Sequence, residues 1–221
     1  IPPNTLSPDL LLVVEIDEPW FEALAEVRGR YPHRVECVRG DGLGIALWSR
    51  LELGSPSVSF LVSDRRPSVW ARVMLPGAKT VRFVGLHPTP PGLEKPHEDD
   101  RFDSDNRDEE LAIVARRVAD SENNNENDLW LVAGDLNDVA WSRTTAQFKR
   151  RSGLVDPRVG RGFVNSFHAQ YPLLRYPLDH VFFSQQIGLA AYKRFRLPGS
   201  DHFGLRADLA VAHDDLRATT S

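Results

Sequence analysis

Cysteine is nearly missing from this chain: its 221 residues include one, Cys37. A single cysteine cannot form a disulfide bond within the chain, so the fold must be held by a hydrophobic core. In an apolar stretch such a residue is more often a small core side chain than a nucleophile. Low cysteine content is typical of cytoplasmic proteins and of many exported bacterial domains, so it does not decide the compartment.

Long apolar runs and a surplus of positive charge are missing as well. No run of about 18 apolar residues occurs, which excludes a membrane-spanning helix within the sequence. The chain has 27 Lys and Arg against 31 Asp and Glu, a net charge of −4 and a pI near 6.0. A dedicated duplex-DNA binder usually carries a basic surface, so this balance argues against one. A nuclease needs only a local basic patch and stays open.

Secondary-structure signals alternate along the chain and predict one α/β domain over residues 1–212, with a polar tail at 213–221. Short apolar or alternating runs predict strands at 9–16, 34–38, 44–49, 57–62, 68–75, 80–86, 129–133, 178–184 and 205–211. Helical spacing predicts helices at 18–29, 111–119 and 143–152. The segment 87–110 is Pro-rich and then acidic, and we expect a long surface loop there. Because the sequence begins at Ile1 without Met or a signal peptide, we expect it to be part of a longer protein.

Groups that can bind a metal or transfer a proton stand where several predicted strands begin or end. Carboxylate and amide oxygens suit hard cations such as Mg²⁺ or Mn²⁺, and histidine transfers protons near neutral pH. Strand ends that meet at one edge of a sheet can assemble a site without contiguous sequence. The residues are Glu15, His87, Asp135, Asn137, Asp179, Asp201 and His202.

Each of these residues has a simpler interpretation when taken alone. Glu15 can end a strand and cap the helix that follows, and His87 can be an ordinary loop histidine. Asp135 with Asn137 can form an Asx turn. The two Asp-His pairs can be plain loop residues. Their joint occurrence at strand ends predicts the active site of a metal-dependent phosphoester hydrolase.

Six segments resemble the endonuclease/exonuclease/phosphatase superfamily, which includes DNase I-like nucleases, abasic-site endonucleases, sphingomyelinases and inositol polyphosphate phosphatases. They are SPDLLLVVE (7–15), GIALWSR (44–50), VGLH (84–87), VAGDLN (132–137), YPLDHVFFS (176–184) and GSDH (199–202), in the family's order. YPHRV (31–35), RRPSVWARV (65–73) and the HPTPP loop (87–91) resemble a bacterial branch that is often anchored to the membrane. The resemblance implies a four-layer α-β-β-α sandwich of two mixed β-sheets flanked by helices, lacking its first N-terminal strand.

The resemblance also implies roles for the acidic residues. Glu15 resembles the principal metal ligand, and Asp201 resembles a second carboxylate of the metal or water site. Asp135 and Asn137 resemble the pair that orients the attacking water and the scissile phosphate. The implied cofactor is Mg²⁺ or Mn²⁺.

The histidines and two residues of the acidic segment receive roles in the same way. His202 resembles the general base or a phosphate-contacting histidine, and Asp179 the carboxylate that fixes its tautomer. His87 resembles the histidine that stabilises the pentavalent phosphorus or the leaving oxygen. Asn106 or Arg107 is expected to reach the substrate phosphate, although Arg107 can also be a surface residue at a helix start.

Two departures from the family pattern bear on activity. The family's first strand ends in an Asn that helps hold the metal, and the sequence starts after it, which leaves open a catalytically weak or inactive binding domain of the same fold. Phe203-Gly204 replaces the basic or small residue and Pro of relatives, and we expect it to alter the rim of the site.

Other classes fit the sequence less well. A calcineurin-type metallophosphatase needs D-x-H, GNH-[DE] and G-H-x-H motifs, and none of them occurs. A DNA-binding module would rest on a basic cluster that a solvated helix face explains equally well. That cluster is Arg143, Lys149, Arg150, Arg151, Arg158 and Arg161.

The expected substrate is a small phosphodiester or a lipid head group, with nucleic acid next, because the acidic segment 92–110 disfavours a long polyanion. We expect a monomer, and no protein partner follows from the sequence. By resemblance, the expected setting is a soluble domain of a membrane-anchored bacterial protein, outside the cytoplasm.

Overall fold

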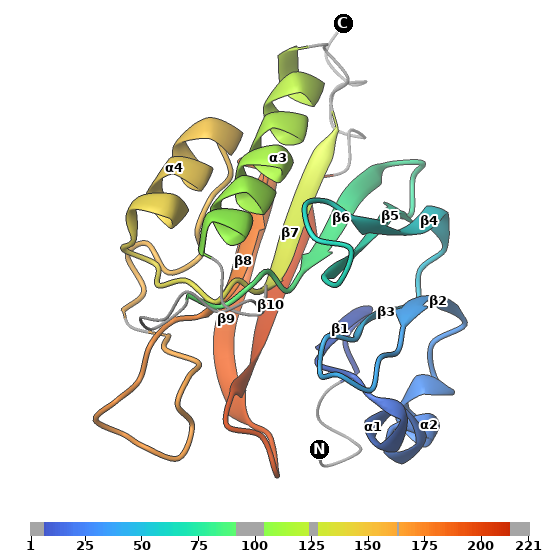
Figure 1. Ribbon diagram of the computed structural model, residues 1–221. Helices are drawn as coiled ribbons and strands as arrows, with labels where there is room; N and C mark the ends of the chain where they lie inside the picture. Colours follow the sequence, from blue (N-terminus) through green and yellow to red (C-terminus); the bar gives the residue numbers. More distant parts are fainter. Residues whose placement is uncertain (1–6, 92–103, 124–127, 163, 213–221) are drawn as a thin grey trace, which may run out of the picture.

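A computed structural model describes residues 7–91, 104–123, 128–162 and 164–212 (Figure 1). The predicted tail at 213–221 and most of the acidic segment, 92–103, lie outside the described residues. Among the described helices, none combines the length and the hydrophobicity that crossing a bilayer requires.

The described strands form one large and two small sheets, and the helices lie outside them (Figure 1). The large sheet has the order β4-β5-β6-β7-β8, and the small sheets have the orders β1-β3-β2 and β10-β9. The β6–β7 pair is parallel and its neighbours are antiparallel, so the large sheet is mixed. The strands are β1 (Leu10–Val14), β2 (His33–Cys37), β3 (Ile45–Ser49), β4 (Leu53–Phe60), β5 (Pro67–Met74), β6 (Thr80–Leu86), β7 (Leu129–Asp135), β8 (Asp179–Phe183), β9 (Ile187–Arg196) and β10 (Phe203–Val211). The helices are α1 (Glu18–Ala23), α2 (Ala25–Arg28), α3 (Ser104–Asn123) and α4 (Arg143–Ser152).

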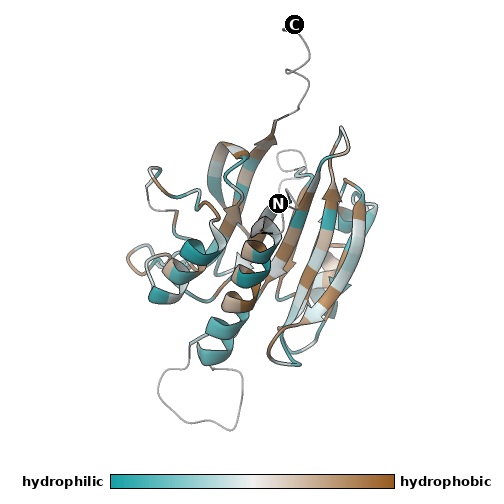
Figure 2. Ribbon diagram, turned by 90° about the horizontal axis from the view of Figure 1, so that it is seen from above, coloured by the Kyte–Doolittle hydropathy of each residue, from teal (hydrophilic) through white to brown (hydrophobic). Residues whose placement is uncertain are grey.

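Three hydrophobic cores separate four layers. The first lies between the large sheet and helices α3 and α4, where Phe148 of α4 packs on the sheet. Figure 2 shows both helices on the same side of that sheet. The second core joins Phe83 on the opposite face of the sheet to Leu47 of β3. The third joins Trp48 of β3 to α1 and α2. Leu47 and Trp48 enter different cores because successive strand residues point to opposite faces. The predicted four-layer sandwich is confirmed.

Helix α3 corrects one prediction. The loop expected over 87–110 ends earlier, because α3 begins at Ser104 rather than near residue 111. The buried face of its first turns is made by Arg107 and Glu110, at helical spacing ahead of the buried Leu111 and Val114. A search for apolar periodicity does not register polar residues on a buried face, so the first two turns were missed.

Strand β9 was missed for a different reason. Its sequence, IGLAAYKRFR, mixes small and charged residues, and most of its side chains are exposed or half-buried. It forms an antiparallel hairpin with β10, with a register shift at Asp208/Leu209. Pairing with β10 therefore decides that this segment is a strand.

The single helix expected over 18–29 is instead divided into α1 and α2, which meet at Leu24.

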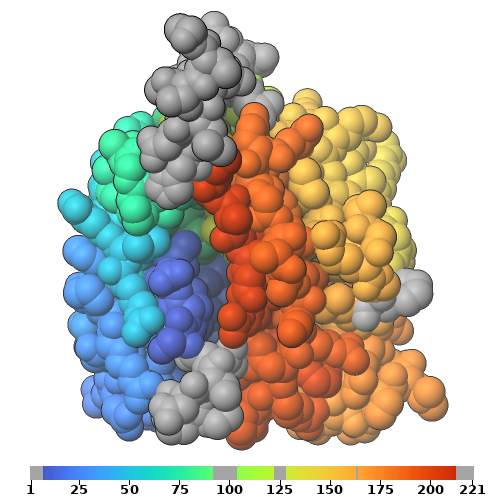
Figure 3. All heavy atoms as spheres, turned by 180° about the vertical axis from the view of Figure 1, so that it is seen from behind, coloured from blue at the N-terminus to red at the C-terminus, as the bar shows by residue number. Residues whose placement is uncertain are grey.

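A groove separates the two small sheets. β1 and β10 are edge strands, and neither pairs along its outer edge with another described strand. Between them lies a cavity of about 730 Å³ whose apolar floor includes Val81, Phe83 and Leu131. Figure 3 shows the hollow between β1 in blue and β10 in red. Free backbone groups on both edges can pair with a further strand, which would join the small sheets into one.

Candidate active site

Five of the predicted site residues meet at one end of the sandwich. Glu15 follows β1, His87 follows β6, and Asp135 ends β7. β6 and β7 are parallel, so their carboxyl ends coincide, and Asp135 lies directly opposite Asp179 in the β7–β8 ladder. His202 comes immediately before β10. The topology therefore collects side chains from five separate strands.

Gly134 makes this convergence close. It is paired with Leu86 across the β6–β7 ladder and has a φ of 150°. A Cβ atom at Gly134 would come within 1.9 Å of the Leu86 carbonyl oxygen, so only glycine fits. The close approach of the two backbones brings the end of β6, with His87, beside Asp135.

His202 lies between two carboxylates. Its Nδ1 is 2.7 Å from Oδ2 of Asp179, and its Nε2 is 3.7 Å from Oδ2 of Asp135. Burial by itself lowers the pKa of His202, but the hydrogen bond to Asp179 and the negative charges of Asp179, Asp135 and Asp201 outweigh burial and raise it to about 9. The ring of Phe167 packs on the imidazole at 4.8 Å between centroids. These contacts hold the imidazole in one orientation.

The carboxylate of Asp135 lies in an unusual environment. Burial raises the pKa of Asp135, and the negative charge of Asp179 raises it further. The charge of His202 and a hydrogen bond from the Asn137 backbone N–H to Oδ1 at 2.9 Å act in the opposite direction. The carboxylate is thus more basic than an ordinary aspartate and is held in place by its own loop.

Glu15 and Asn137 share a strained backbone conformation. Their φ angles are 61° and 50°, in the left-handed region that non-glycine residues rarely adopt. Such strain persists where surrounding structure over-determines it, and it concentrates at functional sites. The Glu15 side chain is 66% exposed, and its Oε1 is 3.7 Å from Nε2 of His87. Partial burial raises the pKa of Glu15, and the charges of Asp201 and Asp179 add to this against the opposing charge of His202.

His87 is buried behind Glu15. Its side chain is 4% exposed, and its Nδ1 has no hydrogen-bond partner among the described residues. Burial lowers the pKa of His87 to about 3, with the positive charges of Arg66 and His202 acting in the same direction, so the ring is neutral near pH 7. A neutral imidazole at this position can donate one hydrogen bond toward the site.

The sequence interpretation missed Arg66. This arginine precedes β5, is 7% exposed, and donates from Nη1 to the His87 carbonyl at 3.3 Å. Its charge acts on Glu15 and Asp135, which places a cation beside the carboxylates. The segment RRPSVWARV, which contains Arg66, resembles a bacterial branch, but that resemblance assigns no role to this arginine.

The carboxylates fit a divalent cation. Ligand atoms of Asp135, Asp179 and His202 lie within 4.8 Å of one another, and no other such group occurs among the described residues. The sequence-predicted ligands Glu15 and Asp201 lie outside this group of three, although the charge of Asp201 raises the pKa of both Glu15 and His202. Several oxygen donors whose negative charges converge suit a hard cation that neutralises them. Asp135 and Asp179 are the described carboxylates that lie close enough together to hold it.

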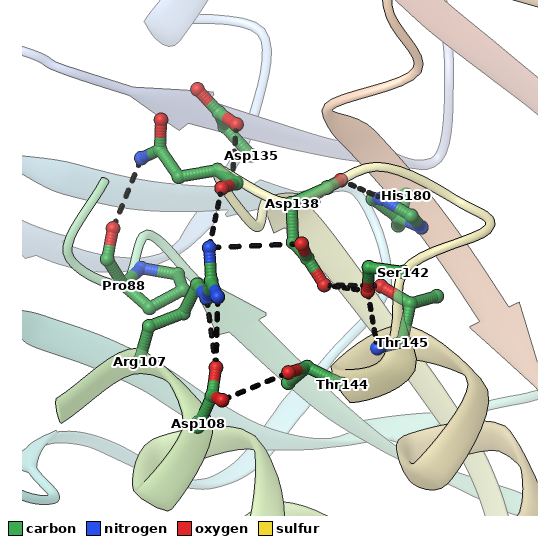
Figure 4. Close-up of polar contacts among 10 residues, drawn as sticks. Pro88, Arg107, Asp108, Asp135, Asp138, Ser142, Thr144, Thr145 and His180 are labelled. Atoms are coloured by element: carbon green, nitrogen blue, oxygen red, sulfur yellow. Dashed lines mark hydrogen bonds and ion pairs between the residues drawn. The ribbon is translucent and has the colours of Figure 1, made fainter. Parts of the chain in front are cut away.

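Arg107 supports the site from below (Figure 4). It is 8% exposed, and its Nη1 donates to the Asn137 carbonyl at 3.1 Å and lies 3.6 Å from Oδ1 of Asp138. Its Nε and Nη2 donate to Asp108 at 3.0 and 2.9 Å. Protein groups thus engage the guanidinium, so the alternative of a surface residue at the helix start is wrong, and contact with phosphate stays a prediction. Asn106 lies in the first turn of α3 and makes no hydrogen bond to site residues within the described part of the chain.

Asp138 joins the loop after β7 to α4 and β8. Its carboxylate accepts hydrogen bonds from the hydroxyls of Ser142 and Thr145 at the start of α4. Its carbonyl lies 2.8 Å from Nε2 of His180, the residue after Asp179 (Figure 4). The side chain of Asn137 donates from Nδ2 to the Pro88 carbonyl at 3.0 Å, which ties the same loop to the end of β6.

His180 continues the support into a buried network. Burial lowers the pKa of His180 to about 3, and the charge of Arg158 acts in the same direction, so the ring is neutral. A neutral ring with its proton on Nε2 donates to the Asp138 carbonyl, and Nδ1 accepts from Nη2 of Arg158 at 2.6 Å. Arg158 is held in turn by Asp156, at 2.9 and 3.0 Å. The sequence pattern contained His180 beside Asp179 but did not show this supporting role.

Replacement of Arg107 by methionine is expected to lower the free energy of unfolding by about 2–3 kcal/mol, because Asp138 and the Asn137 carbonyl lose a charged donor. We expect kcat to fall about tenfold with KM nearly unchanged, since the loop that bears Asp135 loses its position. Urea unfolding and steady-state kinetics measure both effects. Arg116→Met on the exposed face of α3 is the control. A raised KM with unchanged stability would instead support phosphate contact by Arg107.

The comparison with known families now decides the classification. The model of the Endonuclease/Exonuclease/phosphatase family matches residues 4–202. The chain belongs to this family. Its enzymes hydrolyse phosphoesters and generally depend on divalent metals. No curated protein sequence matches the chain.

Solved structures confirm the fold. An endonuclease/exonuclease/phosphatase from Bacteroides vulgatus is 17% identical, with a TM-score of 0.71 over 92% of this chain and 85% of that chain. The human Nocturnin catalytic domain with bound sulfate is 14% identical, with a TM-score of 0.67 over 93% and 82%. D. rerio TDP2 in complex with a single-stranded DNA product is 15% identical, with a TM-score of 0.70 over 92% and 86%. At these identities the likeness concerns the fold alone.

Proposed function

We propose that this chain is a metal-dependent phosphoester hydrolase that uses water, activated by His202, for in-line attack on phosphorus. The observation that carries the proposal is the position of His202. Its Nδ1 is hydrogen-bonded to Asp179 at 2.7 Å while its Nε2 faces Asp135 at 3.7 Å, at an end of the sandwich that water can reach. A histidine oriented on one side and open on the other is suited to proton transfer.

The chain's own residues have distinct tasks in this mechanism. Asp179 holds the proton on Nδ1 of His202, which leaves Nε2 to accept the proton of the attacking water. Asp135 and the amide oxygen of Asn137 orient that water and the phosphate. His87, neutral and buried, donates toward the oxygen that leaves or gathers charge.

A Mg²⁺ or Mn²⁺ ion, held by Glu15, Asp201 and the neighbouring carboxylates, would supply neutralisation of phosphate charge. The same carboxylate charges raise the pKa of His202 in their unneutralised state. A cation bound there would neutralise them and would lower the pKa of His202 toward its ordinary value, which suits an imidazole that acts as a base at neutral pH.

The structural neighbours support a phosphate-like substrate. The human Nocturnin domain holds a sulfate anion, and the D. rerio TDP2 complex holds a single-stranded DNA product. Arg66 places a positive charge beside the carboxylates of this chain, which suits an anionic ester. A small phosphodiester, a lipid head group and nucleic acid all meet this requirement.

The test is hydrolysis of bis(p-nitrophenyl) phosphate and of p-nitrophenyl phosphate with Mg²⁺ or Mn²⁺, followed by EDTA. We expect metal-dependent release from at least one ester, lost in EDTA. The ratio of the two rates ranks diester against monoester. Absence of release with every metal, from a folded chain, would contradict the proposal.

A catalytically weak or inactive binding domain is the second candidate. The observation that favours it is the groove between β1 and β10, because neither of these edge strands pairs along its outer edge with another described strand. Calorimetric binding of Mn²⁺ together with absent turnover would identify this case. If a strand added ahead of Ile1 produces turnover, the fold of this chain supports catalysis and the binding-domain alternative is wrong.

A further inference from the structure

The connection between α4 and β8 has an unusual composition. From residue 157 to residue 178 the sequence contains Arg158, Arg161 and Arg175 and neither Asp nor Glu, although the whole chain has a net charge of −4. The segment forms a projection at the lower left of Figure 1, beyond the end of the large sheet. Asp156 neutralises Arg158, so Arg161 and Arg175 carry the positive charge of this segment.

The tip of this projection exposes large apolar side chains. The tip consists of residues 171–174 with Tyr176, and the Leu174 N–H donates to the Tyr171 carbonyl at 3.1 Å to close its turn. Leu173 is 96% exposed, Leu174 58%, Tyr171 57% and Tyr176 43%. A leucine that is 96% exposed contributes almost nothing to the protein's own core. Gathered exposed apolar groups of this size mark an interaction surface.

The tip is fixed to the active site. The Ala169 N–H donates to the Asp201 carbonyl at 2.6 Å, and the Phe203 N–H donates to the Ser166 carbonyl at 2.8 Å. The ring of Phe167 packs on the imidazole of His202 at 4.8 Å. These contacts hold the apolar tip in a fixed position relative to His202, on the rim of the site.

Arginines surround the base of the projection. Arg175, Arg194 and Arg196 lie over the Phe203 ring, at 5.1, 4.7 and 5.6 Å from its centroid. Arg175 and Arg196 also donate to the Ala169 carbonyl. Arg194 donates to the Asn165 carbonyl, and none of the three arginines pairs with a carboxylate within the described ranges, so no protein carboxylate neutralises their positive charge there. Phe203, the residue that departs from the family pattern, is the platform that gathers them.

We infer that this tip docks on an anionic lipid bilayer and presents the site to a phosphoester in a lipid head group. The inference rests on the proposed function for its substrate, but the docking itself does not. Leu173 and Leu174 suit the hydrocarbon boundary, and the flanking tyrosines suit the headgroup level. The arginines complement anionic lipids.

Other partners fit the same surface less well. A single-stranded nucleic acid would gain from the arginines and the tyrosine rings, but a leucine pair at the tip offers no stacking face to a base. A protein interface usually has few charges at its apolar centre, whereas Arg175 is adjacent to Leu174. The combination of leucine tip, tyrosine flanks and arginine base favours the bilayer.

The test is co-sedimentation with vesicles of phosphatidylcholine and phosphatidylserine in equal parts, and with vesicles of phosphatidylcholine alone. We expect the chain to bind the mixed vesicles more tightly, and Leu173→Asp/Leu174→Asp to weaken that binding by at least about tenfold. Leu173→Ser/Leu174→Ser repeats the test without added charge. Phe60→Asp/Met74→Asp, at exposed apolar positions of β4 and β5, is the matched control and is expected to bind like the wild type.

Turnover of bis(p-nitrophenyl) phosphate is measured in the same samples and is expected to be unchanged in both leucine variants. Absent vesicle binding by the wild type, or equal binding by the leucine variants, overturns the inference. Binding of a single-stranded oligonucleotide that depends on the leucines, without vesicle binding, also overturns it. Vesicle binding that depends on the leucines, together with absent metal-dependent release from both nitrophenyl esters, supports the docking and rejects the proposed function instead.

Discussion

Replacement of His202 by alanine is expected to lower kcat for phosphodiester hydrolysis by about 10³-fold, within the range that a positioned general base contributes. The side chain is 23% exposed and lies at the end of the sandwich, so its removal leaves no large internal cavity. The melting temperature should therefore stay within a few degrees of the wild type. Steady-state kinetics at saturating Mn²⁺ and differential scanning calorimetry measure the two effects.

His33→Ala is the matched control for this experiment. His33 lies on β2, at the edge of its sheet away from β1, and is expected to leave kcat unchanged. Asp179→Asn keeps the shape of the carboxylate but loses its charge. We expect its kcat to lie between that of His202→Ala and that of His33→Ala. Turnover by His202→Ala within about twofold of the wild type would remove this histidine from the mechanism.

Replacement of Glu15 by glutamine is expected to raise the Kd for Mn²⁺ by at least about tenfold, because the site loses one negative oxygen donor. The substitution is nearly isosteric and the side chain is 66% exposed, so the strained backbone at this position should persist. Isothermal titration calorimetry measures Mn²⁺ affinity directly, without reference to turnover.

Glu18→Gln provides the control for the loss of one negative charge. Glu18 is exposed at the start of α1, three residues beyond Glu15, and is expected to leave Mn²⁺ affinity unchanged. A second readout is the increase in melting temperature on addition of Mg²⁺, which should shrink in Glu15→Gln alone. An unchanged Kd for Glu15→Gln would exclude this residue as a ligand.

The layers and most strands were predictable because their signals are local. The alternation that sends Leu47 to one core and Trp48 to another is already present in the sequence, and so is the apolar run of β7 that ends in Asp135. Helix α4 begins after the Ser142 cap and ends at Gly153 in a left-handed conformation, so its predicted range, 143–152, is confirmed. By contrast, the start of α3 was hidden because Arg107 and Glu110 form its buried face.

The residues of the candidate site could be predicted from the sequence, but the distances between their side chains could not. Acidic and histidine residues at strand ends can be read from the chain, because strand ends are marked by the apolar runs that precede them. The distance of 3.7 Å between His202 and Asp135 depends on the pairing of Asp135 with Asp179 in the β7–β8 ladder and on the contact of His202 with Asp179, and no local pattern encodes either of them. Arg66 escaped notice for the same reason, since its loop becomes part of the site only through packing.

The sequence by itself determined the layered α/β sandwich and the set of metal-competent residues, because period-two alternation and terminal polar groups are local properties, and six of its segments indicated the family by resemblance. The tertiary structure alone decided that Arg107 supports the Asn137–Asp138 loop, that His180 locks this loop to β8, and that Leu173 stands exposed beside the site. These roles depend on which residues meet across the fold. A buried polar group forms hydrogen bonds with the groups that packing places beside it, and the local sequence does not specify those groups.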